Sequence, residues 1–511
     1  MGYFKVILLL FFPLIVLNTR AQQPHIFLAE PLDNEKKELD WSFVGCTPSK
    51  TIILNRVTGK SNSLGIKLFE NDSLTLLNSK TIDLQADDED LDPEMVFNIG
   101  DQLYLMGSLR NKSKGNRTLY GGVFSLKAEQ VQALRPICAM PEGRLKNKQS
   151  FGMELAMDSS LLFSHYQLEP EKGEGIRFEL NVFDPQLNLI HSKRLALPYP
   201  EETMEISEWL IDRDTNIWFL TGISPQKNIS GLTDLERSNR RYVLFSYSFK
   251  ENRLKEFDVN LKDKWVMALT FEEMENDEIC IGGFYSKDPA FSISGTFFLR
   301  IGISDKEVIS TGMMAFDKGF VRDNARNGNF DKELSNYYFD QFIPSRDDGA
   351  WFLAEQYYVT EQFLMDGNTG RTNTSYTYHY NDILVVKVNK GGEIQFARRI
   401  PKAQFSVNDG GPYLSYALSS TDSGISIVFY DHLENTKLSS NQKPRSMSNL
   451  KKAVLNHVEV NEDGLVTRTL LKGLDKKNLI RPKQAYEVGK GELVFLNENR
   501  KSRQIIRMSF E

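Results

Sequence analysis

The chain has 511 residues, of which 41% are hydrophobic and 25% charged, so it can bury a large core and does not have the composition of a disordered protein. Its formal net charge is −6. Without residues 1–21 the balance is 60 basic against 68 acidic residues, or −8. A protein that follows phosphate backbones carries the opposite bias, so the composition argues against nucleic acid as a partner.

The first residues have the pattern of a secretory signal peptide. Lys5 precedes an apolar run, Val6–Leu17, and small residues then place a cleavage point before Gln22. The alternative is a membrane anchor, but this run is interrupted by a proline and is far shorter than the about 20 residues that cross a bilayer. We therefore expect residues 1–21 to be removed and 22–511 to form one exported domain, with no transmembrane segment in the mature chain.

Three cysteines, Cys46, Cys138 and Cys280, lie in apolar strand-like runs. Their number is odd and no two are close in sequence, which does not favour a disulfide framework or a metal site. Buried thiols behave as small hydrophobic groups. We expect these cysteines to belong to the core and predict no cofactor.

A short hairpin recurs eight times along the chain. Each copy has an apolar strand, a polar turn rich in Asp, Gly, Ser or Asn, and a second strongly apolar strand. Such turn residues adopt left-handed backbone angles or bond their own backbone, and therefore mark chain reversals. The copies are Cys46–Ile53, Asn98–Leu105, Ala156–Phe163, Asp212–Phe219, Met274–Ile281, Ser345–Phe352, Ser420–Ile427 and Val488–Phe495.

A second hairpin follows in seven of the eight periods, for example at Phe183–Ile190, Val388–Ile394 and Val460–Val466. Two hairpins in each period make a four-stranded antiparallel unit, and repeats of such units are typical of a β-propeller. The predicted fold is therefore all-β, a single β-propeller. Eight blades are favoured, and seven is the alternative because the first period is the shortest.

The last period ends with one strand too few, at Gln504–Phe510, where the chain stops. At the other end, His25–Ala29 is a spare apolar strand before the first full period. If this strand pairs with the last blade, the ring closes and no strand edge is left exposed. The alternative is that His25–Ala29 is only a remnant beside the signal peptide.

In a propeller, both hairpins of a blade turn on one face, and the remaining loops emerge on the other. We call this other side the long-loop face, because its predicted loops vary greatly in length. Length variation on one face of a rigid repeat is typical of a binding surface. The long segments predicted there are Ile223–Arg240, Asp317–Asn336, Tyr357–Tyr380, Ala403–Gly411 and Asp431–Leu450.

The sixth and seventh periods hold the densest set of candidate binding residues. Tyrosines offer flat amphipathic contact area, and Asp and His side chains can hold a hydroxylated ligand by hydrogen bonds. The alternative is ordinary sheet packing, because Tyr376, Tyr378 and Tyr380 are two residues apart and share one face of a strand. The candidates are Tyr357, Tyr358, Tyr378, His379, Tyr380, Asp382, Asp409, Asp431 and His432.

No motif assigns a metal or a catalytic residue. The acidic stretches Asp87–Asp92 and Asp212–Asn216 resemble calcium loops, but Ile217 stands where such a loop needs Gly, and no Glu follows at the required spacing. The sequence has no His-Glu-x-x-His, Gly-x-Ser-x-Gly or phosphate-binding glycine loop. Ser345–Gly349 and Ser420–Gly424 resemble the Asp-box turns of sialidase-like propellers, which are structural in that family.

The segment from about 345 to 435 resembles uncharacterised secreted proteins of Bacteroidetes bacteria. The similarity rests on Trp351–Tyr358, Tyr376–Ile383, Gly392–Phe396, Ile400–Lys402 and Asn408–Gly410. It implies a bacterial envelope, periplasmic or extracellular location, and it brings no catalytic residues.

We expect a non-catalytic binding or scaffold protein of the cell envelope that holds a protein or glycan through its long-loop face. The alternative is a carbohydrate-active enzyme, a hydrolase or lyase. That alternative requires at least two carboxylates to converge in a pocket on the long-loop face.

Overall fold

The computed structural model describes residues 23–510, apart from 34–37, 58–61, 129, 132, 144–149, 170–174, 225–239, 289–291, 325–333, 366–371, 439–441, 475–478 and 499–501. The predicted signal peptide lies outside the described residues. Within them the protein is all-β, with a single α-helix, α2 (Lys318–Asn324). No helix in this part of the chain is long and apolar enough to cross a membrane.

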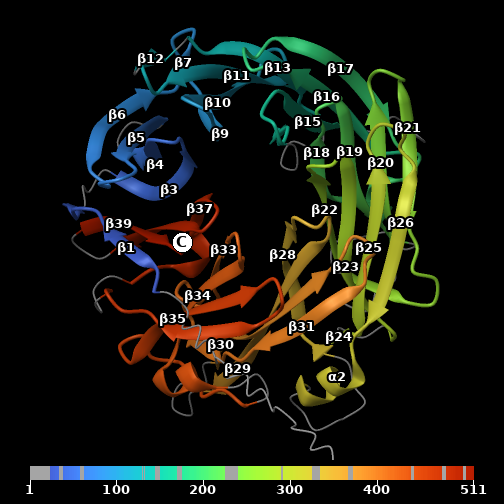
Figure 1. The fold of residues 1–511 in the computed structure, drawn as a ribbon. Coiled ribbons are helices and arrows are strands. Elements are labelled where there is room, and N and C mark those ends of the chain that lie inside the picture. The colour runs from blue at the N-terminus through green and yellow to red at the C-terminus, as the bar shows by residue number, and fades with distance from the viewer. Residues whose placement is uncertain are drawn as a thin grey trace, which may run out of the picture.

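The described strands form eight antiparallel sheets of four or five strands, arranged around a ring (Figure 1). We name each sheet after the first strand of its first hairpin. The first four are the β3 sheet, with β3 (Glu38–Cys46), β4 (Lys50–Val57), β5 (Ser63–Glu70) and β6 (Leu76–Asp83); the β9 sheet, with β9 (Asp92–Ile99), β10 (Gln102–Asn111), β11 (Asn116–Ser125), β12 (Gln130–Val131) and β13 (Arg135–Pro141); the β14 sheet, with β14 (Gly152–Leu155), β15 (Leu162–Leu168), β16 (Arg177–Phe183) and β17 (Leu189–Ala196); and the β18 sheet, with β18 (Met204–Ile211), β19 (Asn216–Ile223), β20 (Arg241–Ser248) and β21 (Arg253–Val259).

The second half of the chain supplies the other four sheets. They are the β22 sheet, with β22 (Trp265–Met274), β23 (Glu278–Ser286), β25 (Gly295–Gly302) and β26 (Val308–Ala315); the β28 sheet, with β28 (Tyr337–Pro344), β29 (Ala350–Met365), β30 (Thr372–Val388), β31 (Ile394–Ile400) and β32 (Gln404–Val407); the β33 sheet, with β33 (Ala417–Ser420), β34 (Gly424–His432), β35 (Ala453–Asn461) and β36 (Val466–Leu470); and the β37 sheet, with β37 (Tyr486–Gly489), β38 (Glu492–Glu498), β39 (Ser502–Ser509), β1 (His25–Leu28) and β2 (Leu32–Asp33). Two small ribbons pair β7 (Gln85–Ala86) with β8 (Glu89–Asp90), and β24 (Ser292–Ile293) with β27 (Leu334–Ser335).

The polar turns of the hairpins are held by their own Asp and Asn side chains. The Asp212 carboxylate accepts hydrogen bonds from the backbone N–H groups of Asp214 and Asn216, both at 2.9 Å, and from the Trp218 indole at 2.7 Å. In the second hairpins Asn389 and Asn461 accept backbone N–H groups in the same way. These side chains replace missing backbone partners, so Asp212 has a structural role in its turn.

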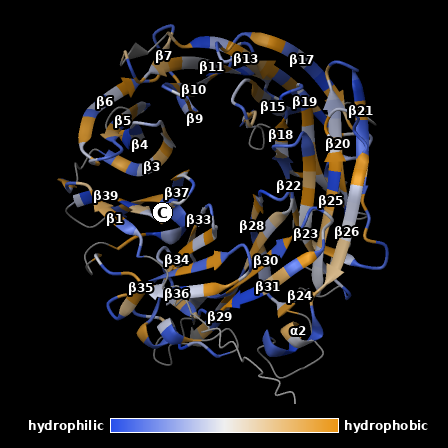
Figure 2. Ribbon diagram, in the orientation of Figure 1, coloured by the Kyte–Doolittle hydropathy of each residue, from blue (hydrophilic) through white to orange (hydrophobic). Residues whose placement is uncertain are grey.

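Hydrophobic side chains pack between neighbouring sheets, and the hydrophobic segments run all around the ring (Figure 2). The second and third strands of each sheet are the most buried, and every residue of β23 is buried. The last strand is mostly exposed, as in β26. One cluster combines Ile53 and Phe69 of the β3 sheet with Val494 and Ile505 of the β37 sheet. The first and last sheets of the chain are therefore neighbours.

The N-terminal strand β1 pairs with the C-terminal strand β39. The pairing is antiparallel, with His25 opposite Ser509 and Leu28 opposite Ile506. The Gln504 side-chain amide also donates to the Ala29 carbonyl at 2.7 Å. Residues from the two ends of the chain thus share one sheet.

Cys280 is fully buried in the core between the β22 and β28 sheets, as the sequence predicts. Burial raises the pKa of its thiol to about 12. Burial also raises the pKa of Cys138 to about 12, and Cys46 is half-buried. All three thiols are free.

Three of the segments predicted as long loops contain regular structure, so these predictions are wrong in part. The segment from Tyr357 to Tyr380 continues the hairpin of β29 and β30, whose pairing runs out to Met365 opposite Thr372. Its Val and Thr residues are strand formers, which the polar composition of the segment concealed. Ala403–Gly411 contains β32, and Asp317–Asn336 contains α2. Most of the predicted loop Ile223–Arg240 lies outside the described residues.

Candidate functional site

The predicted tyrosine and histidine residues lie on the projecting hairpin of β29 and β30. Tyr357 is opposite Tyr380, with ring centroids 4.7 Å apart, and Tyr358 is opposite His379, with ring centroids 4.5 Å apart. Neighbouring residues of a strand face opposite sides. The set is therefore divided, with Tyr378 on the face of Tyr380 and His379 on the other face.

Two of the predicted aspartates are fully buried in ion pairs, one within the β28 sheet and one within the β33 sheet. Asp382 bonds Arg399 at 2.9 Å, and Asp431 lies 3.3 Å from Arg468. A third pair joins Glu355 to Lys402, with 2.5 Å between Oε1 and Nζ. We call these six residues the buried ion-pair network; they are Glu355, Asp382, Arg399, Lys402, Asp431 and Arg468.

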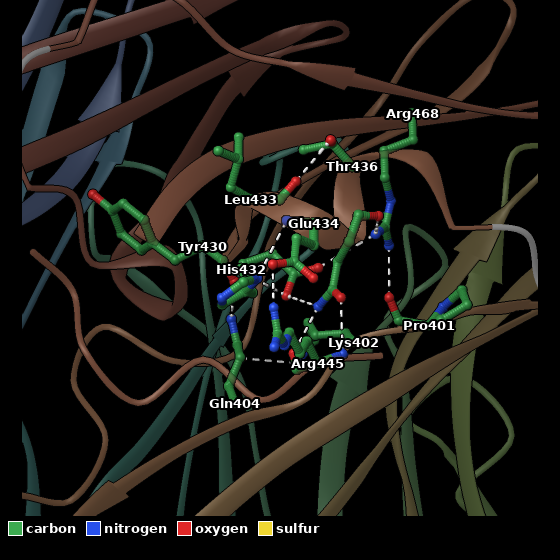
Figure 3. Close-up of polar contacts among 12 residues, drawn as sticks. Pro401, Lys402, Gln404, Tyr430, His432, Leu433, Glu434, Thr436, Arg445 and Arg468 are labelled. Carbon is green, nitrogen blue, oxygen red and sulfur yellow. Dashed lines mark hydrogen bonds and ion pairs between the residues drawn. The ribbon is translucent and has the colours of Figure 1, made fainter. Parts of the chain in front are cut away.

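Hydrogen bonds to the Gln404 side chain and to backbone carbonyls complete this network (Figure 3). Lys402 Nζ also donates to the Gln404 side chain at 2.9 Å, and the Gln404 amide donates to the Tyr430 carbonyl at 2.6 Å. Arg468 donates to the Pro401 carbonyl at 2.7 Å. Buried charges with such complete pairing fix the packing of neighbouring elements, and here they join two sheets.

The last two predicted residues are His432, which ends β34, and Asp409, which lies in a bend after β32. The His432 ring accepts a hydrogen bond from the Glu434 N–H at 3.2 Å and caps the short 3-10 helix η2 (Leu433–Lys437). Asp409 is exposed, and its carboxylate accepts the Gly411 N–H at 2.9 Å. The structure therefore does not gather the nine predicted residues around one cavity.

A separate hollow of about 420 Å³ lies where the first strands of the β18, β22 and β28 sheets face the centre of the ring. We call it the acidic hollow. It reaches the last residues of β19 and the first of β20, so it opens towards the long-loop face. Its polar lining includes Glu205, Glu208, Arg240, Tyr242, Glu272 and Asp340.

β-Bulges shape the strands that line the acidic hollow. Ser207 in β18, Met267 in β22 and Asp340 in β28 are each an extra residue without a partner in the adjacent strand. A bulge redirects the side chains around it and is common beside functional sites. Two of these three extra residues, Ser207 and Asp340, line the hollow.

Among the described residues that line the acidic hollow, carboxylates outnumber cations. Arg240 bonds Glu205 at 2.7 Å, and its side chain is only 9% exposed. Glu208 accepts the Thr270 hydroxyl at 2.7 Å. Within the described residues, neither Glu208, Glu272 nor Asp340 has an ion-pair partner.

Burial acts on the protonation of two of these carboxyls. Burial raises the pKa of Glu272 to about 7, and the negative charge of Glu208 adds to the effect. Burial also raises the pKa of Glu208, although its hydrogen bonds oppose the shift. Two neighbouring carboxyls in one hollow, with one able to hold a proton near neutral pH, can bind hydroxyl or ammonium groups and can transfer a proton.

A second hollow, of about 330 Å³, adjoins the first at Asp340 and Gln341. We call it the tyrosine hollow, because Tyr416 lines it. Tyr416 is 5% exposed, and its hydroxyl makes no hydrogen bond of standard geometry in the described part of the chain, although the Asp340 carboxylate lies close enough to interact with it. Burial raises the pKa of Tyr416 well above its ordinary value, and the charge of Asp340 adds to this. Lys483 and Glu487 complete the polar lining.

Sequence reasoning missed both hollows. Their residues come from five sheets and lie far apart in sequence, from Glu205 to Glu487. The sequence signal that points to these hollows is the presence of acidic residues inside otherwise apolar first strands, as in Met204–Ile211. Across the described residues, no three His, Cys, Asp or Glu side chains are grouped as a metal site would require.

No protein-family model matches the chain, and no curated protein matches it. Among solved structures, it is similar to an uncharacterized protein, lmo1340, from Listeria monocytogenes EGD-e, with 10% identity, 77% of this chain and 85% of that chain covered, and a TM-score of 0.35. It is also similar to the polysaccharide lyase Uly1, with 8% identity, 84% of this chain and 94% of that chain covered, and a TM-score of 0.37. A third similar structure is the WD40 domain of SCAP from fission yeast, with 7% identity, 95% of this chain and 94% of that chain covered, and a TM-score of 0.40. Similarities this weak carry no conclusion about function.

Proposed function

We propose that this chain is an exported binding protein of the bacterial cell envelope, built as an eight-bladed β-propeller that the N-terminal strand closes. Its eight four- or five-stranded sheets support the blade number. The pairing of β1 with β39, and the core shared by the first and last sheets, support closure. The N-terminal sequence pattern and the resemblance to secreted proteins support export.

The acidic hollow binds the ligand, which is a hydroxylated molecule such as a glycan. The observation that carries this proposal is the convergence of Glu205, Glu208, Glu272 and Asp340 on one cavity at the long-loop face. Carboxylates accept hydrogen bonds from sugar hydroxyls, and the Tyr242 ring offers an amphipathic surface beside them. Arg240 contributes a donor in the same cavity.

A glycan array with residues 22–511, followed by calorimetric titration of the hits, tests the binding proposal. The double variant Glu208→Gln/Glu272→Gln should weaken binding at least tenfold, because it replaces hydrogen bonds to ionised carboxylates, worth about 1.5–3 kcal/mol each, by hydrogen bonds to neutral amides, worth about 0.5–1.5 kcal/mol. The matched control is Asp409→Asn, an exposed carboxylate outside the hollow, which should bind as the wild type does. Silence on the array, or loss of binding in the control alone, would contradict the proposal.

The second candidate function is a glycan hydrolase, favoured by the pKa of Glu272, about 7, beside a second carboxyl. A general acid works best when its pKa lies near the working pH, and glycoside hydrolysis uses two carboxyls. Release of reducing ends that Glu272→Gln abolishes without loss of binding would establish this function. Binding without turnover would leave the non-catalytic function in place.

A further inference from the structure

We propose that the acidic hollow and the tyrosine hollow form one elongated site for an extended, non-anionic oligosaccharide, whose hydroxyl groups reach Tyr416. This inference rests on the proposed function and adds the length and charge class of the ligand. The ligand is thus expected to be a chain of sugars and not a single sugar, and its sugars are expected to be neutral or amino sugars and not uronic acids.

The two hollows share part of their lining. Asp340 and Gln341 of β28 belong to both, while the acidic hollow extends over the β18 and β22 sheets and the tyrosine hollow extends over the β33 and β37 sheets. Five consecutive sheets therefore contribute to two hollows that adjoin at these shared residues. The shared position is the bulge of β28, where Asp340 is exposed and unpaired in the sheet. A ligand that fills both hollows must pass over this bulge, which requires an elongated molecule.

The buried Tyr416 hydroxyl makes no hydrogen bond of standard geometry within the described residues, and the Asp340 carboxylate, which lines both hollows, lies close to it. Buried hydroxyls are nearly always hydrogen-bonded, because an unsatisfied one is costly. The Tyr416 ring is held in the core between the β28 and β33 sheets while the residue lines the tyrosine hollow. A ligand hydroxyl in that hollow would satisfy this group. Glu487, whose Oε1 accepts the Ser419 hydroxyl and the Ser420 N–H at 2.8 Å, is already fixed beside it.

The charge of the lining selects against acidic sugars. The described lining of the two hollows carries five carboxyl groups and two cations, Arg240 and Lys483. Arg240 is engaged by Glu205, and Lys483 lies 4.8 Å from the centre of the Tyr380 ring. An anionic chain would lose its hydration against like charges. Neutral chains, and chains with ammonium groups, avoid this cost.

Three ladders of oligosaccharides from disaccharide to hexasaccharide test the inference by titration calorimetry on residues 22–511. The ladders are β-1,4-linked N-acetylglucosamine, which is neutral, the same chain de-acetylated, which is cationic, and oligogalacturonate, which is anionic. We expect affinity in a neutral or cationic ladder to rise with length until both hollows are filled, and oligogalacturonates not to bind. Equal affinity for short and long chains, or preference for the anionic ladder, would overturn the inference while leaving sugar binding intact. Absence of binding in all three ladders would overturn the inference, and a silent glycan array would overturn the proposed function as well.

The variant Tyr416→Phe separates the two hollows. It should weaken binding of the longest chains about tenfold, the effect of one lost hydrogen bond of ordinary strength, and leave disaccharides in the acidic hollow unchanged. The matched control is Tyr104→Phe, which removes a buried hydroxyl that donates to the Pro185 carbonyl at 2.8 Å, far along the ring. Equal affinity of Tyr416→Phe and wild type for long chains would show that the ligand does not reach the tyrosine hollow.

Discussion

Two regions of the molecule concentrate charged side chains, and they use them differently. In the buried ion-pair network every carboxylate faces a cation, as Glu355 faces Lys402 and Asp382 faces Arg399. In the acidic hollow, Glu208 and Glu272 lie side by side in a lining whose one described cation, Arg240, is bound to another carboxylate. The first arrangement is complete within the protein, whereas the second leaves capacity for a ligand.

The comparison shows why residue type alone is a weak guide to function. Buried charges need partners, and a protein that supplies all of them gains a specific packing of sheets. A carboxyl that keeps a raised pKa and no cationic partner indicates a site where another molecule can supply the missing interaction. Candidate functional carboxyls are therefore distinguished by the absence of a cationic partner in the protein.

The largest effect is expected from breaking the buried network. Lys402→Met should destabilise the protein by about 3–5 kcal/mol, because it leaves the Glu355 charge buried without its partner. Lys402 is fully buried, and its Nζ lies 2.5 Å from Glu355 Oε1. Urea unfolding followed by circular dichroism measures the change.

The double variant Glu355→Gln/Lys402→Met provides the control for this prediction. It removes both charges, so it should recover part of the lost stability. A loss below about 1 kcal/mol in Lys402→Met would show that the network is not needed for sheet packing, and the contrast with the acidic hollow would fail.

A smaller effect, with a characteristic pH dependence, is expected in the acidic hollow. The pKa of Glu272 is about 7 in the folded protein, above its ordinary value of 4.5, so the folded state binds a proton that the unfolded state has released. Its stability contribution is therefore complete below pH 4.5 and is lost as the pH rises through 7. Glu272→Gln does not titrate and should gain stability relative to wild type, on the order of 1 kcal/mol at pH 8 after solvent screening.

Thermal unfolding midpoints of both proteins between pH 5 and pH 8 measure this difference. Glu154 also has a pKa near 7 through burial, but it is present in both proteins and cancels in the comparison. The expected signature is a gap between the two midpoints that widens with pH. A constant gap would mean that Glu272 is already ionised at pH 5.

Much of the fold follows from the sequence because the turns are local. The eight predicted first hairpins all join adjacent antiparallel strands. In the turn at Asp212, for example, the Asp side chain bonds backbone groups two and four residues away. The spare strand at residues 25–29 was recognisable from the count of hairpins. The extension of β29 and β30 was not, because polar Thr and Tyr residues form strands as readily as they form loops when a partner strand is present.

The site could not be predicted in the same way, because it depends on contacts between distant strands. Asp382 and Asp431 were attractive candidates beside tyrosines, and only the fold shows that Arg399 and Arg468 neutralise them. The bulge that exposes Asp340 arises from a register shift between β28 and β29, which no local pattern specifies. A sequence thus locates turns well and locates converging side chains poorly.

The smallest effect on stability is expected at the centre of the proposed elongated site. Asp340→Asn should change the free energy of unfolding by less than about 0.5 kcal/mol, because an exposed residue without an ion-pair partner contributes little to stability. Asp340 is exposed on a bulge and has no ion-pair partner in the described chain. Paired with Lys402→Met in urea unfolding, this variant sets the two regions side by side: a charge the fold needs against a charge it can lose. A cost for Asp340→Asn as large as that of Lys402→Met would place Asp340 among the structural charges, and the hollow would then need no ligand to explain it.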